Sequence, residues 1–365
     1  MNAPITRRDF FKASAVAGAA VAVGGSVPAA SPGQAKSCIF LMLTGGPSQL
    51  DTWDPKPEAP SDVRGPFSPI RTAVPGMHVS ELFPKMAAMA DKFSLIRTMH
   101  HEYAPIHENG FQLLNTGRRF GDGEWPGVGA VVSRLTGENS RNISWWVLPH
   151  DRLETGVSIS HGQQTGHLEI PKYSRSCLHD MKAADTDQHP FSIMTQVAGA
   201  AVWQGSRFVT VNANPTVFDA ISWDCHADKG SLRTTLADYR DTVAPDFDEA
   251  YTSLLTDLEE KGLLDTTLVV AVGEFGRTPK LNCHGGRDHW ANCWTAIVAG
   301  GGTRGGRIIG ESDAIAGEPK DRPVHCSELV ATIYHALGIS NATTIPGPDG
   351  IPVRVVDAEP VMELF

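Results

Sequence analysis

Positive charge is scarce in this chain of 365 residues, in which 31 lysines and arginines stand against 41 aspartates and glutamates for a formal net charge of −10. Binding to a nucleic-acid backbone depends on clustered lysines and arginines, because their contacts release counterions from the phosphates. The acidic balance therefore excludes nucleic acid from the partners that we expect.

Long apolar runs are missing beyond the N-terminal segment, so no membrane helix is expected in the mature protein. Residues 6–12 read TRRDFFK and are followed by small apolar residues up to position 23, which is typical of a bacterial twin-arginine export signal. We place this signal at residues 1–35, with cleavage after Ala29, Ala30 or Ala35. A retained anchor is the alternative, but we expect a periplasmic or extracellular protein without an integral membrane span.

CxxC pairs and interdomain linkers are also missing. The six cysteines are spread through the chain, so a zinc ribbon is not expected. Cys283 and Cys293 would either form a disulfide in an oxidising compartment or pack as small buried residues. No segment rich in Pro and Ser divides the sequence after the signal, and we predict a single domain at residues 36–365.

Short apolar runs alternate with helical patterns along the chain. Six runs have the length of strands and turn residues beside them: 38–43, 93–96, 145–148, 208–211, 268–272 and 295–299. Helices are expected at 245–261 and 327–337, where apolar residues share one face and a glycine follows. This alternation predicts an α/β fold with a central, largely parallel sheet covered by helices on both faces, with its site at the carboxyl ends of the strands.

Polar clusters follow three of the expected strands. After the run at 38–43 come Asp51 and Asp54, which would either reach a metal or cap a turn. After the run at 208–211, Asp224 and His226 lie close together in an irregular segment, where both would bind one ion. A solvated surface pair of Asp and His is the common alternative.

The third cluster follows the run at 268–272. Residues 273–279 read GEFGRTP, and the glycines on both sides of Glu274 let the backbone turn sharply. Asp288 and His289 come soon after, and we predict that Glu274, Asp288 and His289 are metal ligands. In the alternative, Glu274 and Arg277 pair with each other in a glycine-rich loop.

Carboxylates and imidazoles in one site favour Zn²⁺, Mn²⁺ or Ca²⁺ over a soft, thiolate-bound metal. We expect one or two divalent ions, which would polarise an oxyanion ester and activate water. Arg277 or Arg118 would hold the oxyanion through both arms of a guanidinium.

The order of these motifs resembles an exported bacterial family, known as domain of unknown function 1501. The likeness is carried by GGPSQLDT at 45–52, LNTGR at 114–118, WDCH at 223–226, GEFGRTP at 273–279 and GRDHW at 286–290. It continues through ATIYHALG at 331–338. The family is similar in turn to the alkaline phosphatase and sulfatase superfamily, whose members hydrolyse or transfer phosphate and sulfate esters at one or two metals.

The resemblance implies an alkaline phosphatase or sulfatase-like fold, and it divides the predicted ligands between two metal sites. Asp224, His226 and His289 match the positions that hold one metal, while Asp51 and Glu274 match the carboxylates of a second. The sequence departs from the superfamily at 274–275, where Glu-Phe replaces an Asp-His pair and one imidazole is missing.

A second departure concerns the nucleophile. Sulfatases carry a modified Cys or Ser shortly before the segment that matches LNTGR, whereas residues 100–108 here read HHEYAPIHE. His107 is then a candidate phosphoryl acceptor or an extra ligand, and metal-activated water is the other nucleophile that we consider.

Two functions follow as hypotheses. The first is an exported, metal-dependent hydrolase of sulfate or phosphate esters, acting on a small molecule or a polysaccharide. The second is a catalytically inactive relative that binds a carbohydrate or protein partner outside the cytoplasm. Trp145, Trp146 and Trp290 would stack on sugar rings in the second case, or pack in the core.

Overall fold

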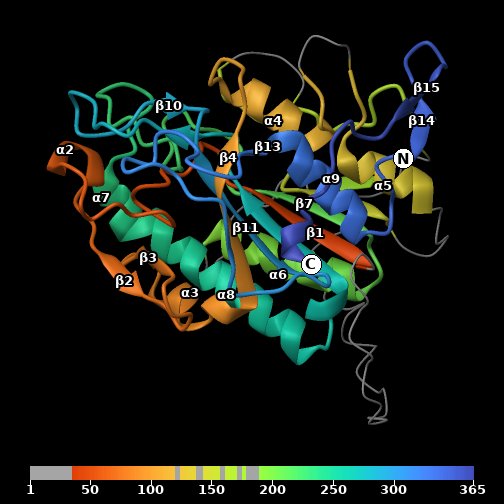
Figure 1. Ribbon diagram of the computed structural model, residues 1–365. Helices are drawn as coiled ribbons and strands as arrows, with labels where there is room; N and C mark the ends of the chain where they lie inside the picture. Colours follow the sequence, from red (N-terminus) through yellow and green to blue (C-terminus); the bar gives the residue numbers. More distant parts are fainter. Residues whose placement is uncertain (1–34, 120–123, 137–142, 157–160, 171–174, 178–188) are drawn as a thin grey trace.

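The computed structural model describes residues 35–119, 124–136, 143–156, 161–170, 175–177 and 189–365 (Figure 1). Its main sheet has nine strands, of which eight follow the spatial order β12-β4-β11-β8-β1-β7-β5-β6 and β13 pairs with β4. The strands are β1 (Ser37–Met42), β4 (Phe93–His100), β5 (Trp145–Leu148), β6 (Arg175–Cys177), β7 (Phe208–Asn212), β8 (Thr267–Val272), β11 (Trp294–Gly300), β12 (Ile308–Ile309) and β13 (Val324–His325).

Most neighbouring strands of this sheet run parallel, as the sequence predicted. The central strand β1 is parallel to both β7 and β8, and β5 is parallel to β7 and β6. The exception is β11, which is antiparallel to β8 and β4. After β8 the chain makes a long excursion over residues 273–293 and returns beside the same strand, which makes an antiparallel neighbour possible without a crossover helix.

Helices cover both faces of the sheet (Figure 1). One face packs against α3 (Pro84–Ala88), α6 (Pro190–Trp203) and α8 (Ala244–Glu260), and the other against α4 (His107–Thr116), α5 (Val128–Thr136) and α9 (Cys326–Ala336). Alternate residues of β1 divide between the two cores, with Ile39 and Leu41 on the α8 side and Phe40 on the α9 side. A strand buried on both faces must be apolar throughout, which explains its continuous hydrophobic run.

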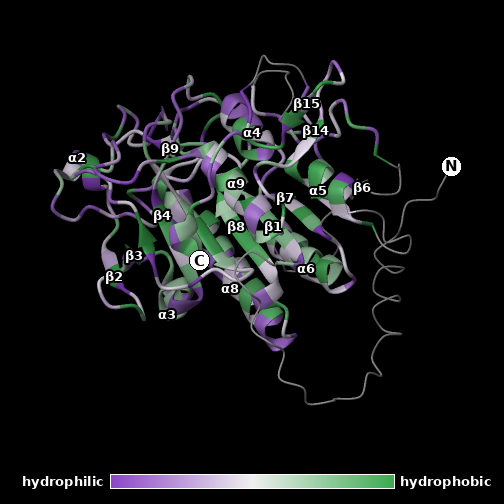
Figure 2. Ribbon diagram, turned by 45° about the vertical axis from the view of Figure 1, so that its right-hand side comes forward, coloured by the Kyte–Doolittle hydropathy of each residue, from purple (hydrophilic) through white to green (hydrophobic). Residues whose placement is uncertain are grey.

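The hydropathy of the elements agrees with this layered arrangement. Figure 2 shows hydrophobic strands in the centre and largely hydrophilic loops near β9 and α4. No helix in the described part of the chain is long and apolar enough to cross a bilayer. Trp145 and Trp146 are buried in the core, so the sugar-stacking alternative does not hold for them, whereas Trp290 is half-buried.

Shorter elements complete the fold. They are the helices α2 (Ser61–Arg64) and α7 (Leu236–Asp238), the π-helix Tyr239–Val243, the 3-10 turns Ala90–Lys92, Leu264–Thr266 and Met362–Leu364, and three two-stranded sheets: β2 (Pro69–Arg71) with β3 (His78–Ser80), β9 (Gly276–Arg277) with β10 (His289–Trp290), and β14 (Thr344–Pro346) with β15 (Pro352–Arg354). The sheet of β9 and β10 belongs to the excursion between β8 and β11, and it carries residues of the third predicted cluster.

The two helices predicted from periodicity are confirmed as α8 and α9, and the six predicted strands are confirmed as β1, β4, β5, β7, β8 and β11. The alternative of a disulfide between Cys283 and Cys293 is not realised. Cys283 is exposed, while Cys293 is buried with its Sγ 3.4 Å from the carbonyl oxygen of Arg97. The predicted signal at residues 1–35 lies, except for Ala35, outside the described residues.

Candidate metal centre

The loops that carry the predicted ligands leave the sheet side by side. In the register of the central strands, Met42 of β1 is paired with Asn212 of β7 and with Val272 of β8. The residues that follow these three strands therefore meet at one edge of the sheet, as expected for the carboxyl ends of parallel strands. Gly45 makes this approach possible, because a Cβ at that position would lie 2.4 Å from the backbone nitrogen of Asp224.

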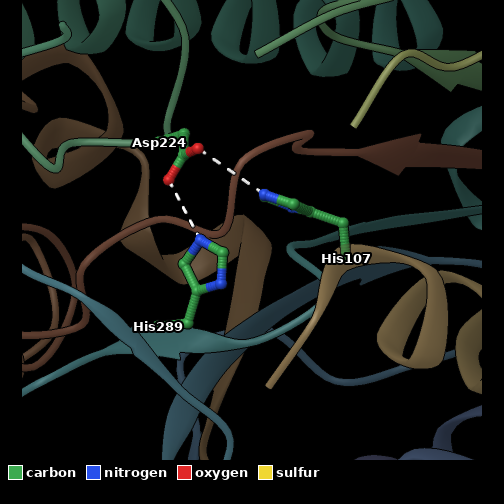
Figure 3. A group of neighbouring side chains, drawn as sticks. All are labelled: His107, Asp224 and His289. Atoms are coloured by element: carbon green, nitrogen blue, oxygen red, sulfur yellow. Dashed lines mark hydrogen bonds and ion pairs between the residues drawn. The ribbon is translucent and has the colours of Figure 1, made fainter. Parts of the chain in front are cut away.

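Three side chains from distant segments form the centre of the site. Figure 3 shows His107, Asp224 and His289 pointing toward one another. One ligand atom from each lies within 4.8 Å of the others. Nε2 of His289 is 3.3 Å from Oδ1 of Asp224, and Nε2 of His107 is 3.5 Å from its Oδ2. His289 lies on β10, His107 is the first residue of α4, and Asp224 lies in the loop after β7.

His226 adds a third imidazole to this group. Its Nε2 lies 3.1 Å from Oδ1 of Asp224, and its ring centroid is 4.7 Å from that of His289. The Nε2 atoms of three histidines thus surround one carboxylate. We call His107, Asp224, His226 and His289 the ion group.

The other ring nitrogen of each histidine meets a fixed acceptor. The Nδ1 contacts are Glu274 Oε1 at 2.5 Å from His107, Asp288 Oδ1 at 3.1 Å from His226, and the Pro105 carbonyl oxygen at 2.8 Å from His289. Such acceptors hold the proton on Nδ1, so Nε2 is the nitrogen that would bind a metal once it carries no proton, which is how metal-binding histidines are usually oriented.

Several buried polar atoms of this region have no hydrogen-bond partner among the described residues. They include Oδ2 of Asp224, Oε2 of Glu274 and Nε2 of His226. A buried polar atom left without a partner costs about 1–3 kcal/mol, and more when it is charged. A divalent cation would satisfy such atoms, so the residues fit a metal ion.

The charges around Asp224 favour its ionised form. Burial opposes ionisation, but the positive charge of Arg277 and the close contacts with the three histidines hold the pKa of Asp224 well below its usual range. At His289, burial is the main cause that lowers the pKa to about 4, so this ring is neutral near pH 7. At His107, burial is opposed by hydrogen bonds and charge from Asp224 and Glu274, which raise the pKa to about 9.

Arg277 is placed differently from the prediction. Its side chain is fully buried, and its nitrogens donate to the carbonyl oxygens of Gly46, Arg287 and Gly45 and to Oδ1 of Asp224. A fully buried guanidinium whose three nitrogens all donate to the protein does not reach a substrate oxyanion. The geometry does not support the predicted oxyanion role, and Arg277 instead holds Asp224 in place.

Arg118 lies at the other end of helix α4 from His107. Its guanidinium carbon sits 4.0 Å from the ring centroid of Trp125, and its Nη2 donates to the carbonyl oxygen of Arg354. Ten helical residues separate the two ends, about 15 Å at 1.5 Å per residue. The predicted role of Arg118 as an oxyanion clamp at the ion group is therefore not supported either.

The remaining predicted ligands are near the ion group but outside it. Asp51 forms a buried pair with Arg287, whose Nε lies 2.6 Å from Oδ2 of Asp51. Glu274 contacts the group through Nδ1 of His107 and accepts a hydrogen bond from the backbone nitrogen of Gly45 at 2.8 Å. Asp288 contacts it through His226 and is largely exposed. Asp51 is thus paired with an arginine and Asp288 is largely exposed, whereas Glu274 keeps one buried oxygen, Oε2, without a partner among the described residues.

Sequence reasoning did not identify Arg287 as part of the site. Its position within the motif GRDHW, beside two predicted ligands, was the available signal, but the identity of its partner could not be read from spacing. Asp54, considered together with Asp51, accepts a hydrogen bond from the hydroxyl of Ser312 and pairs with Lys56 at 3.1 Å. It takes no part in the ion group.

Solved structures with a similar arrangement of elements share little sequence with this chain. One is the lipoteichoic acid synthase LtaP from Listeria monocytogenes, with 10% identity and a TM-score of 0.47, covering 91% of this chain and 78% of that one. Another is the phosphonate monoester hydrolase SpPMH from Silicibacter pomeroyi, with 13% identity, a TM-score of 0.48 and coverage of 84% and 74%. The PsFucS1 sulfatase from Pseudoalteromonas sp. has 13% identity, a TM-score of 0.44 and coverage of 84% and 68%.

Sequence comparison identifies two regions of the chain. No curated protein sequence matches it significantly. Residues 4–24 match the signal sequence of the twin-arginine translocation pathway, so the protein is exported. Residues 35–170 and 172–365 match the family described as protein of unknown function (DUF1501), and the chain belongs to this family.

Proposed function

We propose that this protein is an exported, metal-dependent hydrolase of sulfate or phosphate esters, and that the ion group holds the metal. One observation supports the proposal above all others: three imidazole Nε2 atoms face a single buried carboxylate while every Nδ1 is held by an acceptor. When bound, a divalent ion supplies a Lewis acid that polarises ester oxygens and activates water.

The donor set favours particular ions. Three imidazole nitrogens and one carboxylate match the ligands of zinc sites, and Mn²⁺ also accepts such mixed ligands. Ca²⁺ prefers six to eight oxygen ligands, which this group does not provide. We therefore propose Zn²⁺ or Mn²⁺, and place Ca²⁺ last among the three ions that the sequence suggested.

The placement of His107 favours a role as ligand over a role as phosphoryl acceptor. Both of its nitrogens are directed at carboxylates, with Nδ1 at Glu274 and Nε2 at Asp224, and the ring is buried. A nucleophile must present a free lone pair toward the substrate. An attack by activated water therefore fits the geometry better than a phosphohistidine.

Substrate would reach the ion group from the side of the more exposed histidines. The side chains of His226 and His289 are 17% and 19% exposed, while those of His107 and Asp224 are at most 4% exposed. Ile106, directly before His107, is 39% exposed. An ester group would thus approach over β10 and the loop after β7, with Asp224 at the bottom of the site.

The proposal is tested with the mature protein loaded with Zn²⁺ or Mn²⁺. We expect release of product from aryl sulfates, aryl phosphates or sulfated polysaccharides, and loss of turnover in Asp224→Asn. Comparison of a sulfate with a phosphate ester of the same alcohol identifies the ester class. A protein that binds neither ion and turns over none of these substrates would contradict the proposal, and an ion without turnover would favour the non-catalytic binding protein.

A further inference from the structure

The carboxylate of Asp51 is fully satisfied by protein groups. Its Oδ2 lies 2.5 Å from the hydroxyl of Ser48 and 2.6 Å from Nε of Arg287, and its Oδ1 lies 3.4 Å from Nη2 of Arg287. Neither oxygen is among the buried polar atoms that lack a partner in the described ranges, whereas Oδ2 of Asp224 and Oε2 of Glu274 are. The capacity to accept a cation therefore lies at Asp224 and Glu274, and not at Asp51.

Arg287 is the counterion of Asp51 and is itself fully buried. Its remaining donors go to the carbonyl oxygens of Val63 at 2.7 Å, Thr278 at 3.1 Å and Pro279. A buried charge is tolerated only when it is paired and hydrogen-bonded in this way. The pair is thus a built part of the fold.

A glycine leaves room for the pair. Gly65 has a φ of +72°, and a Cβ there would lie 2.3 Å from Oδ1 of Asp51 and 3.0 Å from Nη2 of Arg287. A larger residue would push the guanidinium from the carboxylate. The loop after α2 is therefore shaped around this charge pair.

The backbone of Arg287 connects the two loops that carry the ion group. Its amide donates to the carbonyl oxygen of Cys225 at 2.9 Å, and Cys225 lies between Asp224 and His226. Its own carbonyl oxygen accepts from Nη1 of Arg277 at 3.1 Å. His289 follows shortly after on β10. Movement of Arg287 would therefore shift His289 relative to Asp224 and His226.

We infer that the guanidinium of Arg287 takes the place of a second divalent ion, so that the centre binds a single ion, and that Arg287 is a positioning residue for its ligands. Asp224 is also paired with a buried arginine, Arg277, but it keeps Oδ2 without a partner among the described residues, whereas both oxygens of Asp51 are taken up by Ser48 and Arg287. The inference rests on the proposed function, because an ion count requires a bound ion.

The count is measured by elemental analysis of protein saturated with Zn²⁺ and then desalted. We expect one ion per chain in the wild type, one in Asp51→Asn, and none in Asp224→Asn. Two ions in the wild type, or fewer ions in Asp51→Asn than in the wild type, would overturn the inference. No ion in any of the proteins would instead contradict the proposed function, so the two failures are distinguishable.

A double variant is also needed, because Asp51→Asn alone leaves the buried charge of Arg287 without a counterion and would destabilise the fold. In the double variant D51N/R287Q both charges are replaced by neutral amides that can still hydrogen-bond to each other. We expect it to fold and to keep one ion per chain. A double variant that is folded by circular dichroism but binds no ion would contradict the assignment.

The positioning role has its own measurement. R287Q removes side-chain hydrogen bonds that fix the loop before His289, and we expect Zn²⁺ binding to weaken about 10-fold, the lower end of the effect of losing a group that orients metal ligands. R287K, which keeps the charge, should recover part of this loss and hold one ion. Unchanged affinity in folded R287Q would show that Arg287 does not position the ligands.

Discussion

Oε1 of Glu274 lies 2.5 Å from Nδ1 of His107, so a carboxylate that follows strand β8 orients an imidazole at the start of helix α4. The same oxygen accepts from the backbone amide of Gly45, in the turn after β1. One carboxylate thus links three separate segments at the edge of the sheet. We therefore expect Glu274 to affect metal binding through His107.

Glu274→Gln tests this indirect role. The amide keeps the shape of the side chain but removes the charge that supports His107, so we expect the dissociation constant for Zn²⁺ to rise about 10- to 100-fold while the ion count stays unchanged. Competition with a chromogenic chelator measures the affinity. Glu102→Gln is the matched control, because Glu102 is exposed and pairs with His325. Complete loss of the ion in Glu274→Gln would show that Glu274 is itself a ligand.

Proton release should accompany metal binding. Without an ion, Asp224 and Glu274 raise the pKa of His107 to about 9 against the effect of burial, so the ring carries two protons at pH 7.5. A metal must displace one of them, and affinity should rise about tenfold per pH unit up to pH 9. Calorimetry in buffers of different ionisation enthalpy counts the protons. An uptake of protons, or an affinity independent of pH, would contradict this assignment.

His107 also makes the stability of the ion-free protein depend on pH. Its stability should fall as the pH rises, whereas the metal affinity should rise. Because the folded-state pKa of His107 lies above its unfolded value, its stabilising contribution is complete below about pH 6.5 and is lost as the pH rises through about 9. Urea unfolding of the ion-free protein should therefore show decreasing stability from pH 7 to pH 9. Replacing His107 with Gln should flatten that slope.

Gly45→Ala should disturb both the fold and the ion group. Gly45 has a φ of +111°, and a Cβ there would collide with the backbone of Asp224 at 2.4 Å. The strain alone is of order 1–3 kcal/mol, and the collision would displace the Asp224 loop. Gly76→Ala is the matched control, because its φ is +85° but no atom lies within 4 Å of the added Cβ. Only the Gly45 variant should lose Zn²⁺ affinity, and equal loss in both would refute the argument.

The export signal should be cleaved upstream of Ala35. Ala35 is buried, and its amide donates to the carbonyl oxygen of Ala336 at 2.5 Å. A folded passenger therefore does not offer the bond after Ala35 to a peptidase, which needs an accessible, extended segment. We expect the intact mass of the exported protein to correspond to cleavage after Ala29 or Ala30. A mature chain that begins at Lys36 would contradict this expectation.

Local patterns in the sequence were sufficient for the strands and helices of the core. The continuous apolar run at 38–43 and the leucine stripe of α8 each reflect burial that repeats with the period of one element, so neighbouring residues carry the whole signal. The polar clusters after β7 and β8 could also be located, because the carboxyl ends of parallel strands meet at one edge.

The partners of the charged residues were decided only by the tertiary structure. Asp51 and Arg287 are 236 positions apart, and Arg277 and Asp224 are 53 apart, so no local pattern records either pair. How loops from different strands pack over the sheet decides whether a buried carboxylate that meets a guanidinium still keeps an oxygen open to a metal, as Asp224 does and Asp51 does not. The sequence by itself determined which residues arrive at the edge of the sheet, and the packing of the loops decided that Asp51 is satisfied by Arg287 while three histidines face Asp224.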